Sequence, residues 1–322
     1  MKRALITGIN GQDGSYLAEL LLEKGYEVCG ILKRNSVAEN QTARLDSVFK
    51  KINLEYADML DLASLNRVLA QVKPDEIYNL AAQSHVRISF DQPIYTTQVV
   101  AIGTLNILES MKLICPSARF YQASSSEMFG NSFDNDGFQR ETTHMNPTSP
   151  YGCAKVYGYN IVRNYRHSYN LFASNGILFN HESPRRGSNF VTNKVVKEAV
   201  KIKYGLTDKL NLGNLNATRD WGHAKDYVKC MWLMLQHHSP DDFVCATGIS
   251  HSVKDLCEYV FGHLDMDYKA YVGIDEKYMR PEELNDLKGD SSKAKQLLNW
   301  EHTYTFETML DDMIDHWVEI YD

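Results

Sequence analysis

Residues 3–14 read Arg3-Ala4-Leu5-Ile6-Thr7-Gly8-Ile9-Asn10-Gly11-Gln12-Asp13-Gly14. The first five residues predict a short buried strand, and three glycines with the spacing G-x-x-G-x-x-G follow it directly. Glycines let a backbone approach a pyrophosphate closely, and the start of a helix supplies N–H donors and the positive end of its dipole. Because this turn joins a strand to a helix, we expect it to bind a dinucleotide. The alternative is an ordinary tight turn.

Short apolar runs and amphipathic segments alternate after this turn. Strands are predicted at 27–32, 52–57, 76–80 and 118–122, and helices at 14–24, 62–72 and 94–114. A β-α-β-α order places parallel strands side by side with helices on both faces. The fold class predicted is therefore α/β, a doubly wound, Rossmann-like parallel sheet.

The second half of the chain is less regular. We expect a long helix at 151–169, opening after Pro150, then a polar loop at 180–190, a helix at 225–237 and a strand at 242–247. No Ser/Gly linker divides the chain. Residues 1–178 are predicted to form the dinucleotide-binding domain, to which 222–248 return. Residues 179–322 are predicted to form mainly a smaller mixed α/β lobe that binds the substrate.

Composition limits the class of protein. Of the 322 residues, 43% are apolar and 23% are charged, as in a soluble globular enzyme. The net charge of −7 argues against nucleic acid as the main partner. The six cysteines are scattered without metal-ligand spacing, so we expect free thiols in a reducing compartment and no metal site. Neither a signal peptide nor a membrane span is indicated, which predicts a cytoplasmic protein.

Four residues suggest proton-transfer chemistry. Tyr151 and Lys155 are four apart and would share one face of a helix, where an ammonium favours a phenolate that acts as a base near neutral pH. Ser125 and Glu127 precede them. A carboxylate beside this group allows a second proton transfer on one substrate, which suggests an oxidation followed by an elimination. The alternative for Glu127 is a carboxylate that offsets a helix dipole.

The end of the second strand bears on the choice of cofactor. It reads Lys33-Arg34-Asn35, where an NAD site usually carries an acidic residue. Arg34 could bind a 2′-phosphate and stack on adenine, so NADP is favoured over NAD. The alternative is that Lys33 and Arg34 are solvated charges of a loop and do not bind the cofactor. Asp58 could accept a hydrogen bond from the adenine amine, and Leu80-Ala81-Ala82 offers small side chains where the cofactor passes.

Longer motifs carry a family resemblance. They are Gly8–Leu17, Gln122–Glu127, Asn180-His181-Glu182-Ser183-Pro184-Arg185-Arg186-Gly187, Leu212–Leu215, Arg219-Asp220-Trp221-Gly222-His223-Ala224-Lys225-Asp226-Tyr227 and Arg280-Pro281 with Glu283. With them the chain resembles, from end to end, the extended short-chain dehydrogenase/reductase family. Within it, the chain is most similar to the family of GDP-mannose 4,6-dehydratases. Ser125 departs from the family's usual Thr but keeps the hydroxyl.

The resemblance implies two sets of binding residues. For NADP, the full predicted set is Gly8, Gly11, Gln12, Asp13, Gly14, Arg34, Asn35, Asp58, Leu80, Ala81, Ala82, Tyr151, Lys155, His181 and Arg186. For the GDP-sugar, it is Ser84, Asn180, Lys194, Arg219, Arg280 and Glu283. Arg219 and Arg280 could bind a diphosphate by forked hydrogen bonds, and structural salt bridges are the alternative.

The reaction implied is the conversion of GDP-D-mannose to GDP-4-keto-6-deoxy-D-mannose and water, a first step toward GDP-fucose or GDP-rhamnose. Tyr151 would take the proton of the 4-hydroxyl with Ser125 on the same oxygen. Hydride would pass from C4 to NADP and back to C6. Glu127 would remove the C5 proton and assist departure of the 6-hydroxyl.

Other functions stay open on the sequence. Glu127 argues against a simple epimerase, and Ser126-Glu127 in place of an Asp-Glu pair argues against a dehydratase of glucose nucleotides. A silent NADP-binding sensor would be expected to lack Tyr151, Lys155 or Glu127. A weak secondary 4-keto reductase activity is possible. The family also implies a homodimer or homotetramer, in which the Arg185-Arg186 loop could reach a neighbour's cofactor site.

Overall fold

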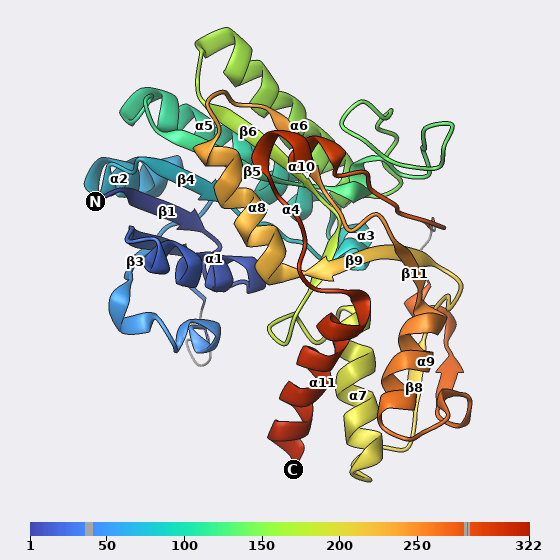
Figure 1. Cartoon of the computed structure of the whole chain (residues 1–322). Coiled ribbons are helices and arrows are strands. Elements are labelled where there is room, and N and C mark those ends of the chain that lie inside the picture. Colours follow the sequence, from blue (N-terminus) through green and yellow to red (C-terminus); the bar gives the residue numbers. More distant parts are fainter. Residues whose placement is uncertain (36–40, 280–281, 283) are drawn as a thin grey trace.

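A parallel sheet forms the centre of the larger part of the molecule. The computed structural model describes residues 1–35, 41–279, 282 and 284–322. The sheet has seven strands in the order β10-β6-β5-β4-β1-β2-β3 (Figure 1). Its strands are β1 Arg3–Thr7, β2 Glu27–Leu32, β3 Asn53–Tyr56, β4 Glu76–Asn79, β5 Arg119–Ser125, β6 Ala173–Leu178 and β10 Asp242–Cys245. All of its strand pairs are parallel, which confirms the doubly wound prediction.

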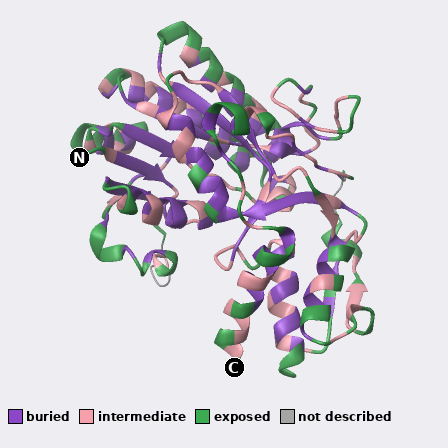
Figure 2. Ribbon diagram, viewed as in Figure 1, coloured by how far each residue is buried: buried purple, intermediate pink, exposed green. Residues whose placement is uncertain are grey.

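Helices cover both faces of this sheet. On one face, α1 (Gln12–Glu23) and α8 (Ala224–Gln236) enclose a hydrophobic cluster that includes Leu17, Leu21 and Met231. On the other, α2 (Leu62–Val72), α5 (Gly103–Ile114) and α6 (Pro150–Tyr169) enclose a second cluster. Most of the strands are therefore buried on both sides, as Figure 2 shows, whereas the edge strand β3 is partly exposed. The strand order reverses beside β1, and in such sheets the ligand crevice lies at the carboxyl ends of the strands there.

The helix expected at 94–114 is interrupted. It consists of α4 (Pro93–Thr97), a π-helical turn at Gln98–Ile102 and α5. The wider turn buries three consecutive residues, Val99, Val100 and Ala101. The short helices α3 (Val86–Asp91) and α10 (Ser292–Leu298) complete this part of the molecule.

A smaller lobe contains the remaining elements. Helices α7 (Val191–Lys203), α9 (Val253–His263) and α11 (Phe306–Tyr321) lie together in Figure 1 and share one hydrophobic cluster with Trp221. Two small sheets accompany them, β11-β9-β7 and β12-β8. Their strands are β7 Asn180–Glu182, β8 Leu210–Leu212, β9 Thr218–His223, β11 Ser250–Ser252 and β12 Val272–Ile274. Among the residues that the structure describes, no helix has the length and apolarity needed to cross a membrane.

The loop expected at 180–190 begins as a strand instead. Strand β7 pairs in parallel with β9, with Asn180 opposite Trp221 and Glu182 opposite His223. The polar composition of this stretch suggested a loop, but backbone pairing with a strand forty residues away overrides that local signal. Only Phe179 separates β6 from β7, so one extended segment contributes to both sheets.

Candidate active site

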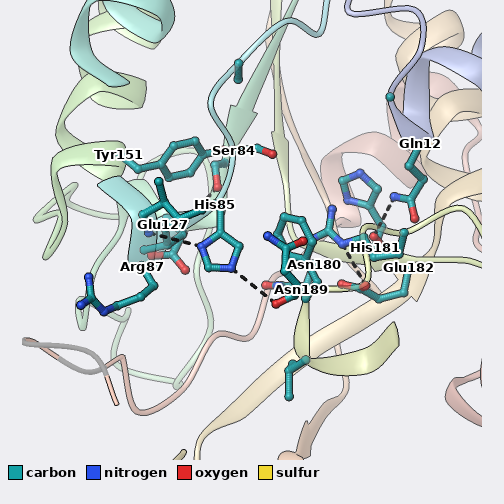
Figure 3. Close-up of a pocket in the computed structure, with 18 of the residues that line it drawn as sticks. Gln12, Ser84, His85, Arg87, Glu127, Tyr151, Asn180, His181, Glu182 and Asn189 are labelled. Carbon is teal, nitrogen blue, oxygen red and sulfur yellow. Dashed lines mark hydrogen bonds and ion pairs between the residues drawn. The ribbon is translucent and has the colours of Figure 1, made fainter. Parts of the chain in front are cut away.

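A single deep cleft brings the chemical groups of both lobes together. Its volume is about 1350 Å³, and its walls come from the glycine turn after β1, the ends of β4, β5 and β6, helix α6 and the start of α7. Figure 3 shows side chains from these segments facing one another across it. It lies where the strand order of the sheet reverses.

The glycine turn can accommodate only backbone. Gly8 has a φ of +68°, and a Cβ there would lie 3.0 Å from the Cα and N of Ala81. A Cβ on Gly14 would lie 2.5 Å from the carbonyl oxygen of Gly8. Both glycines are therefore required, and the turn fits a ligand whose phosphates approach the backbone at the start of α1.

Asp13 at the start of α1 forms an ion pair with His181 of β7. The Nε2 atom of His181 lies 2.8 Å from Oδ2 of Asp13, and Nδ1 lies 2.8 Å from the carbonyl oxygen of Phe179. Because both ring nitrogens face acceptors, both carry protons. Burial alone would lower the pKa of His181, but the Asp13 carboxylate raises it overall. Gln12 links the two segments by donating to the carbonyl oxygen of His181 at 3.1 Å.

The end of β2 differs in detail from the sequence expectation. The residues that line the cleft there are Lys33, Asn35 and Asp58, whereas Arg34 is exposed and donates to the carbonyl oxygen of Asn35 at 2.6 Å. The Nζ atom of Lys33 lies 3.2 Å from Oδ2 of Asp58 and donates to the hydroxyl of Tyr95 at 3.0 Å. The carboxylate expected to meet adenine thus already pairs with Lys33. Tyr95 was not predicted from the sequence.

The four predicted proton-transfer residues line one cleft. Ser125 ends β5, Glu127 follows in a 3₁₀ turn, and Tyr151 and Lys155 project from the first turns of α6. Ser149 fixes the start of α6 by accepting a hydrogen bond from the N–H of Gly152 at 3.0 Å.

Burial dominates the electrostatics of the tyrosine and the lysine. It lowers the pKa of Lys155 to about 8. It also raises the pKa of Tyr151, and the Ser125 hydroxyl partly offsets that effect. The ammonium of Lys155 donates to the carbonyl oxygen of Ala123 at 2.6 Å and lies 5.5 Å from the centre of the Tyr151 ring. The closest partner of the ammonium is therefore a carbonyl oxygen, and the expectation that Lys155 favours a phenolate at Tyr151 stays a prediction.

The residues expected to bind the sugar nucleotide lie mostly in the same cleft. Ser84, Asn180, Lys194 and Arg219 line it. Arg219 is buried and donates to the carbonyl oxygens of Thr218 at 2.7 Å and Leu284 at 3.0 Å. Lys194 donates to the carbonyl oxygen of Asn211 at 2.6 Å. The predicted residues Arg280 and Glu283 lie outside the described part of the chain.

Further residues line the cleft that the sequence did not indicate. His85 and Asn189 face each other from opposite walls, with Nε2 of His85 3.4 Å from the carbonyl oxygen of Asn189 (Figure 3). Glu182 and Phe190, which were not predicted, contact Arg186, which was predicted to bind NADP: its guanidinium pairs with Glu182 at 3.0 Å and stacks on the Phe190 ring. The only sequence feature that could have indicated His85 is its position next to Ser84, which was predicted to bind the substrate. Within the described ranges, no three His, Cys, Asp or Glu side chains are grouped to hold a metal ion.

Comparison with known sequences gives a consistent result. A family profile described as GDP-mannose 4,6 dehydratase matches residues 5–313. GDP-mannose 4,6 dehydratase of Cricetulus griseus is 49% identical over 346 residues, covering 99% of this chain and 92% of that protein. GDP-mannose 4,6 dehydratase 1 of Arabidopsis thaliana is 49% identical over 331 residues, covering 99% of this chain and 90% of that protein.

Solved structures support the fold. UDP-glucose 4-epimerase of Thermotoga maritima, solved with UDP-glucose, superposes with a TM-score of 0.88 at 21% identity and covers 99% of this chain and 100% of that one. The structure of RMD from Pseudomonas aeruginosa complexed with NADPH superposes with a TM-score of 0.83 at 20% identity, covering 99% of this chain and 100% of that one. The two-lobed architecture is therefore shared with proteins whose crystals hold a nucleotide sugar or a nicotinamide cofactor.

Proposed function

The chain belongs to the GDP-mannose 4,6-dehydratase family, and from this premise we propose how its cleft removes water from GDP-D-mannose. The reaction is that of a hydro-lyase and yields GDP-4-keto-6-deoxy-D-mannose. One observation carries the proposal. A carboxylate, Glu127, lines the same cleft as Ser125, Tyr151 and Lys155. A dehydratase needs two proton-transfer groups on one sugar, whereas a simple dehydrogenase or epimerase needs one.

The glycine turn and the second strand bind the nicotinamide cofactor. The backbone at Gly8, Gly11 and Gly14 approaches the pyrophosphate, since no side chain fits there. When bound, the nicotinamide would take up a hydride and later give it back, so no cofactor is consumed overall. The imidazolium of His181 pairs with the Asp13 carboxylate at the start of α1 and so fixes the position of β7 beside the glycine turn.

The first half of the reaction uses Tyr151, Ser125 and Lys155. As a phenolate, Tyr151 accepts the proton of the sugar 4-hydroxyl and becomes a phenol, while the Ser125 hydroxyl donates a hydrogen bond to that sugar oxygen. The positive charge of Lys155 favours the phenolate form of Tyr151 that accepts this proton, in a buried position where charges interact strongly. Its pKa of about 8 leaves most of the lysine protonated at neutral pH.

The second half uses Glu127. Once the 4-hydroxyl has become a ketone, the neighbouring C5–H is acidic, and the Glu127 carboxylate removes that proton. The same side chain then assists departure of the 6-hydroxyl as water. A proton is then restored at C5, and it balances the proton that Tyr151 took from the 4-hydroxyl.

We infer NADP rather than NAD from the charges at the end of β2. Lys33 lines the cleft and the exposed Arg34 follows it, so a 2′-phosphate there would meet two cations, of which Lys33 also pairs with Asp58. Titration calorimetry with both cofactors tests this. Replacing Lys33 and Arg34 together with Ala should remove the preference for NADP⁺ over NAD⁺. An unchanged preference would exclude both residues as the source of selectivity.

The remaining parts of the proposal concern organisation. We infer an NADP-binding domain of residues 1–178 with 222–248, supported by β10 lying beside β6, and a mainly sugar-nucleotide-binding domain of 179–322. A cytoplasmic homodimer or homotetramer is expected, and light scattering measures its mass. A weak secondary 4-keto reductase activity stays a prediction, which incubation of the purified enzyme with NADPH and the keto-sugar would test.

The deciding experiment is mass spectrometry of GDP-mannose incubated with the enzyme and catalytic NADP⁺. Loss of one water without accumulation of NADPH supports the proposed reaction. Glucose nucleotides run in parallel control for substrate choice. Turnover of a glucose nucleotide instead of GDP-mannose would contradict the substrate assignment.

A further inference from the structure

The acceptor that holds the Lys155 ammonium lies just past the end of a strand pairing. Lys155 donates to the carbonyl oxygen of Ala123 at 2.6 Å. The register between β4 and β5 ends at the pair Asn79–Gln122, one residue before Ala123. Ala123 is still paired with β6, opposite Gly176, but on the β4 side the backbone pairing has ended and side chains continue the connection.

Gln122 makes that connection. Its side-chain carbonyl accepts a hydrogen bond from Nδ2 of Asn79 at 2.8 Å, and the hydroxyl of Thr104 lies 3.5 Å away. Its amide nitrogen donates to the carbonyl oxygen of Ala123 at 3.3 Å. Because the oxygen of the amide is engaged on one side, the nitrogen is directed to the oxygen that Lys155 also uses.

The same network reaches the glycine turn. The Thr7 hydroxyl donates to Oδ1 of Asn79 at 2.7 Å and accepts from the N–H groups of Leu80 at 3.0 Å and Ala81 at 3.1 Å. Ala81 is the residue against which Gly8 packs. Thr7, Asn79 and Gln122 are all buried, and buried networks with every member bonded hold their groups in one arrangement.

We infer that Gln122 is a positioning residue for the proposed proton-transfer pair: it orients the Ala123 carbonyl so that the Lys155 ammonium is held beside Tyr151. The inference rests on the roles proposed above for Tyr151 and Lys155. It assigns a task to a residue of the Gln122–Glu127 motif that touches no reacting group. A purely structural role would make Gln122 a buried polar link between β4 and β5, with no effect on how Lys155 titrates.

Two substitutions separate these roles, because they should move the titration of Lys155 in opposite directions. Gln122→Met keeps the volume but removes the donor, so the carbonyl is less fixed and the ammonium less well held. We expect a lower Lys155 pKa, a kcat about tenfold lower and an unchanged KM for GDP-mannose. Gln122→Glu puts a carboxylate beside the same carbonyl, which favours the ammonium. The loss of activity at alkaline pH should then shift to higher pH.

The readout has two parts. NMR of the enzyme labelled with ¹³C at the lysine ε-carbon follows the titration of Lys155 directly, with its signal identified by its loss in Lys155→Arg. The pH dependence of kcat reports the same group during turnover. Gln139→Glu is the matched control, since Gln139 is also fully buried but donates to the carbonyl oxygen of Ser132 in a different loop. It carries a similar cost of burying a carboxylate and should leave the Lys155 titration unchanged.

Opposite shifts in the Met and Glu variants support the inference. Shifts of the same sign, or a Lys155 titration equal to that of the wild-type enzyme in both, would overturn it. If Gln122→Glu does not fold, Gln122→Met decides: a Lys155 pKa at or above the wild-type value overturns the inference. Absence of water loss by the wild-type enzyme would instead contradict the proposed function, because the NMR titration does not depend on turnover.

Discussion

The carboxylate of Asp13 lies 2.8 Å from the imidazole of His181, although 168 residues separate them in the chain. Asp13 is in the first turn of α1 and His181 is on β7, so this contact joins the cofactor turn of the large lobe to the first strand that enters the small one. It is a direct ionic link between the two parts, and its strength should depend on pH.

We expect Asp13→Asn to destabilise the protein by about 3 kcal/mol near pH 6, since it leaves a buried imidazolium without its partner. Asp13 has a lowered pKa, so its contribution is lost as the pH falls through that lowered value. His181 has a raised pKa, so its contribution is lost as the pH rises through that raised value. Urea unfolding of the wild-type protein and of Asp13→Asn gives the free energy of unfolding of each. The two free energies should differ most at pH values between the lowered pKa of Asp13 and the raised pKa of His181. The exposed Asp46→Asn serves as control, and a difference independent of pH would contradict the prediction.

Lys155→Met should stabilise the protein at neutral pH while abolishing activity. Burial lowers the pKa of Lys155 from 10.5 to about 8, which corresponds to a cost on the order of 3 kcal/mol for the ammonium. The lost hydrogen bond to Ala123 offsets about 1 kcal/mol of the gain. Between these two pKa values the unfolded chain binds more protons, so the stability of the wild-type protein rises with pH. Urea unfolding should show that the variant exceeds the wild-type protein in free energy of unfolding by less at pH 10 than at pH 7. An equal difference at both pH values would refute the argument.

Glu127→Gln should separate oxidation from elimination. The amide cannot remove the C5 proton, so loss of water should slow by roughly 10³-fold while the 4-hydroxyl is still oxidised. NADPH and a 4-keto sugar should then accumulate, which absorbance and mass spectrometry detect. Tyr151→Phe is the comparison, because it should form neither. If the Glu127 variant released water at the wild-type rate, another group would have to be the C5 base.

Gly14→Ala should prevent cofactor binding. The added Cβ would lie 2.5 Å from the carbonyl oxygen of Gly8 and 2.6 Å from the Cα of Ile9, both of which are backbone atoms that cannot move aside cheaply. Gly262→Ala on α9 is the matched control, since no atom lies within 4 Å of its Cβ. It should stabilise the helix by roughly 0.5–1 kcal/mol. Calorimetric titration with NADP⁺ and circular dichroism distinguish lost binding from lost folding, and tight binding by the Gly14 variant would contradict the prediction.

Local patterns were enough to predict most of the large lobe. Apolar runs marked the strands, and a buried strand needs only a few consecutive apolar residues to be recognised. The helix that carries Tyr151 and Lys155 was placed to within one residue by Pro150, which begins α6. The glycine spacing indicated the turn, because the backbone approach there excludes any side chain.

Contacts between distant segments could not be predicted in this way. The strand Asn180–Glu182 is polar and forms only because β9 lies beside it. The pairing of Lys33 with Asp58 depends on two loops meeting at the edge of the sheet. The pKa of Tyr151 depends on how deeply the first turn of α6 is buried, which no spacing of residues reveals.

The direct passage from β6 to β7 through Phe179 limits how the two lobes can move. A hinge requires residues whose backbone angles are free to change, and here the residues on both sides are held in sheets. The next place along the chain where it passes between the lobes is also short, because β9 ends at His223 and α8 begins at Ala224. The two lobes should therefore behave as one rigid body, in which the separation between cofactor and sugar is set when the protein folds. Substrate entry and product release would then depend on surface segments such as 183–190 rather than on opening of the domains.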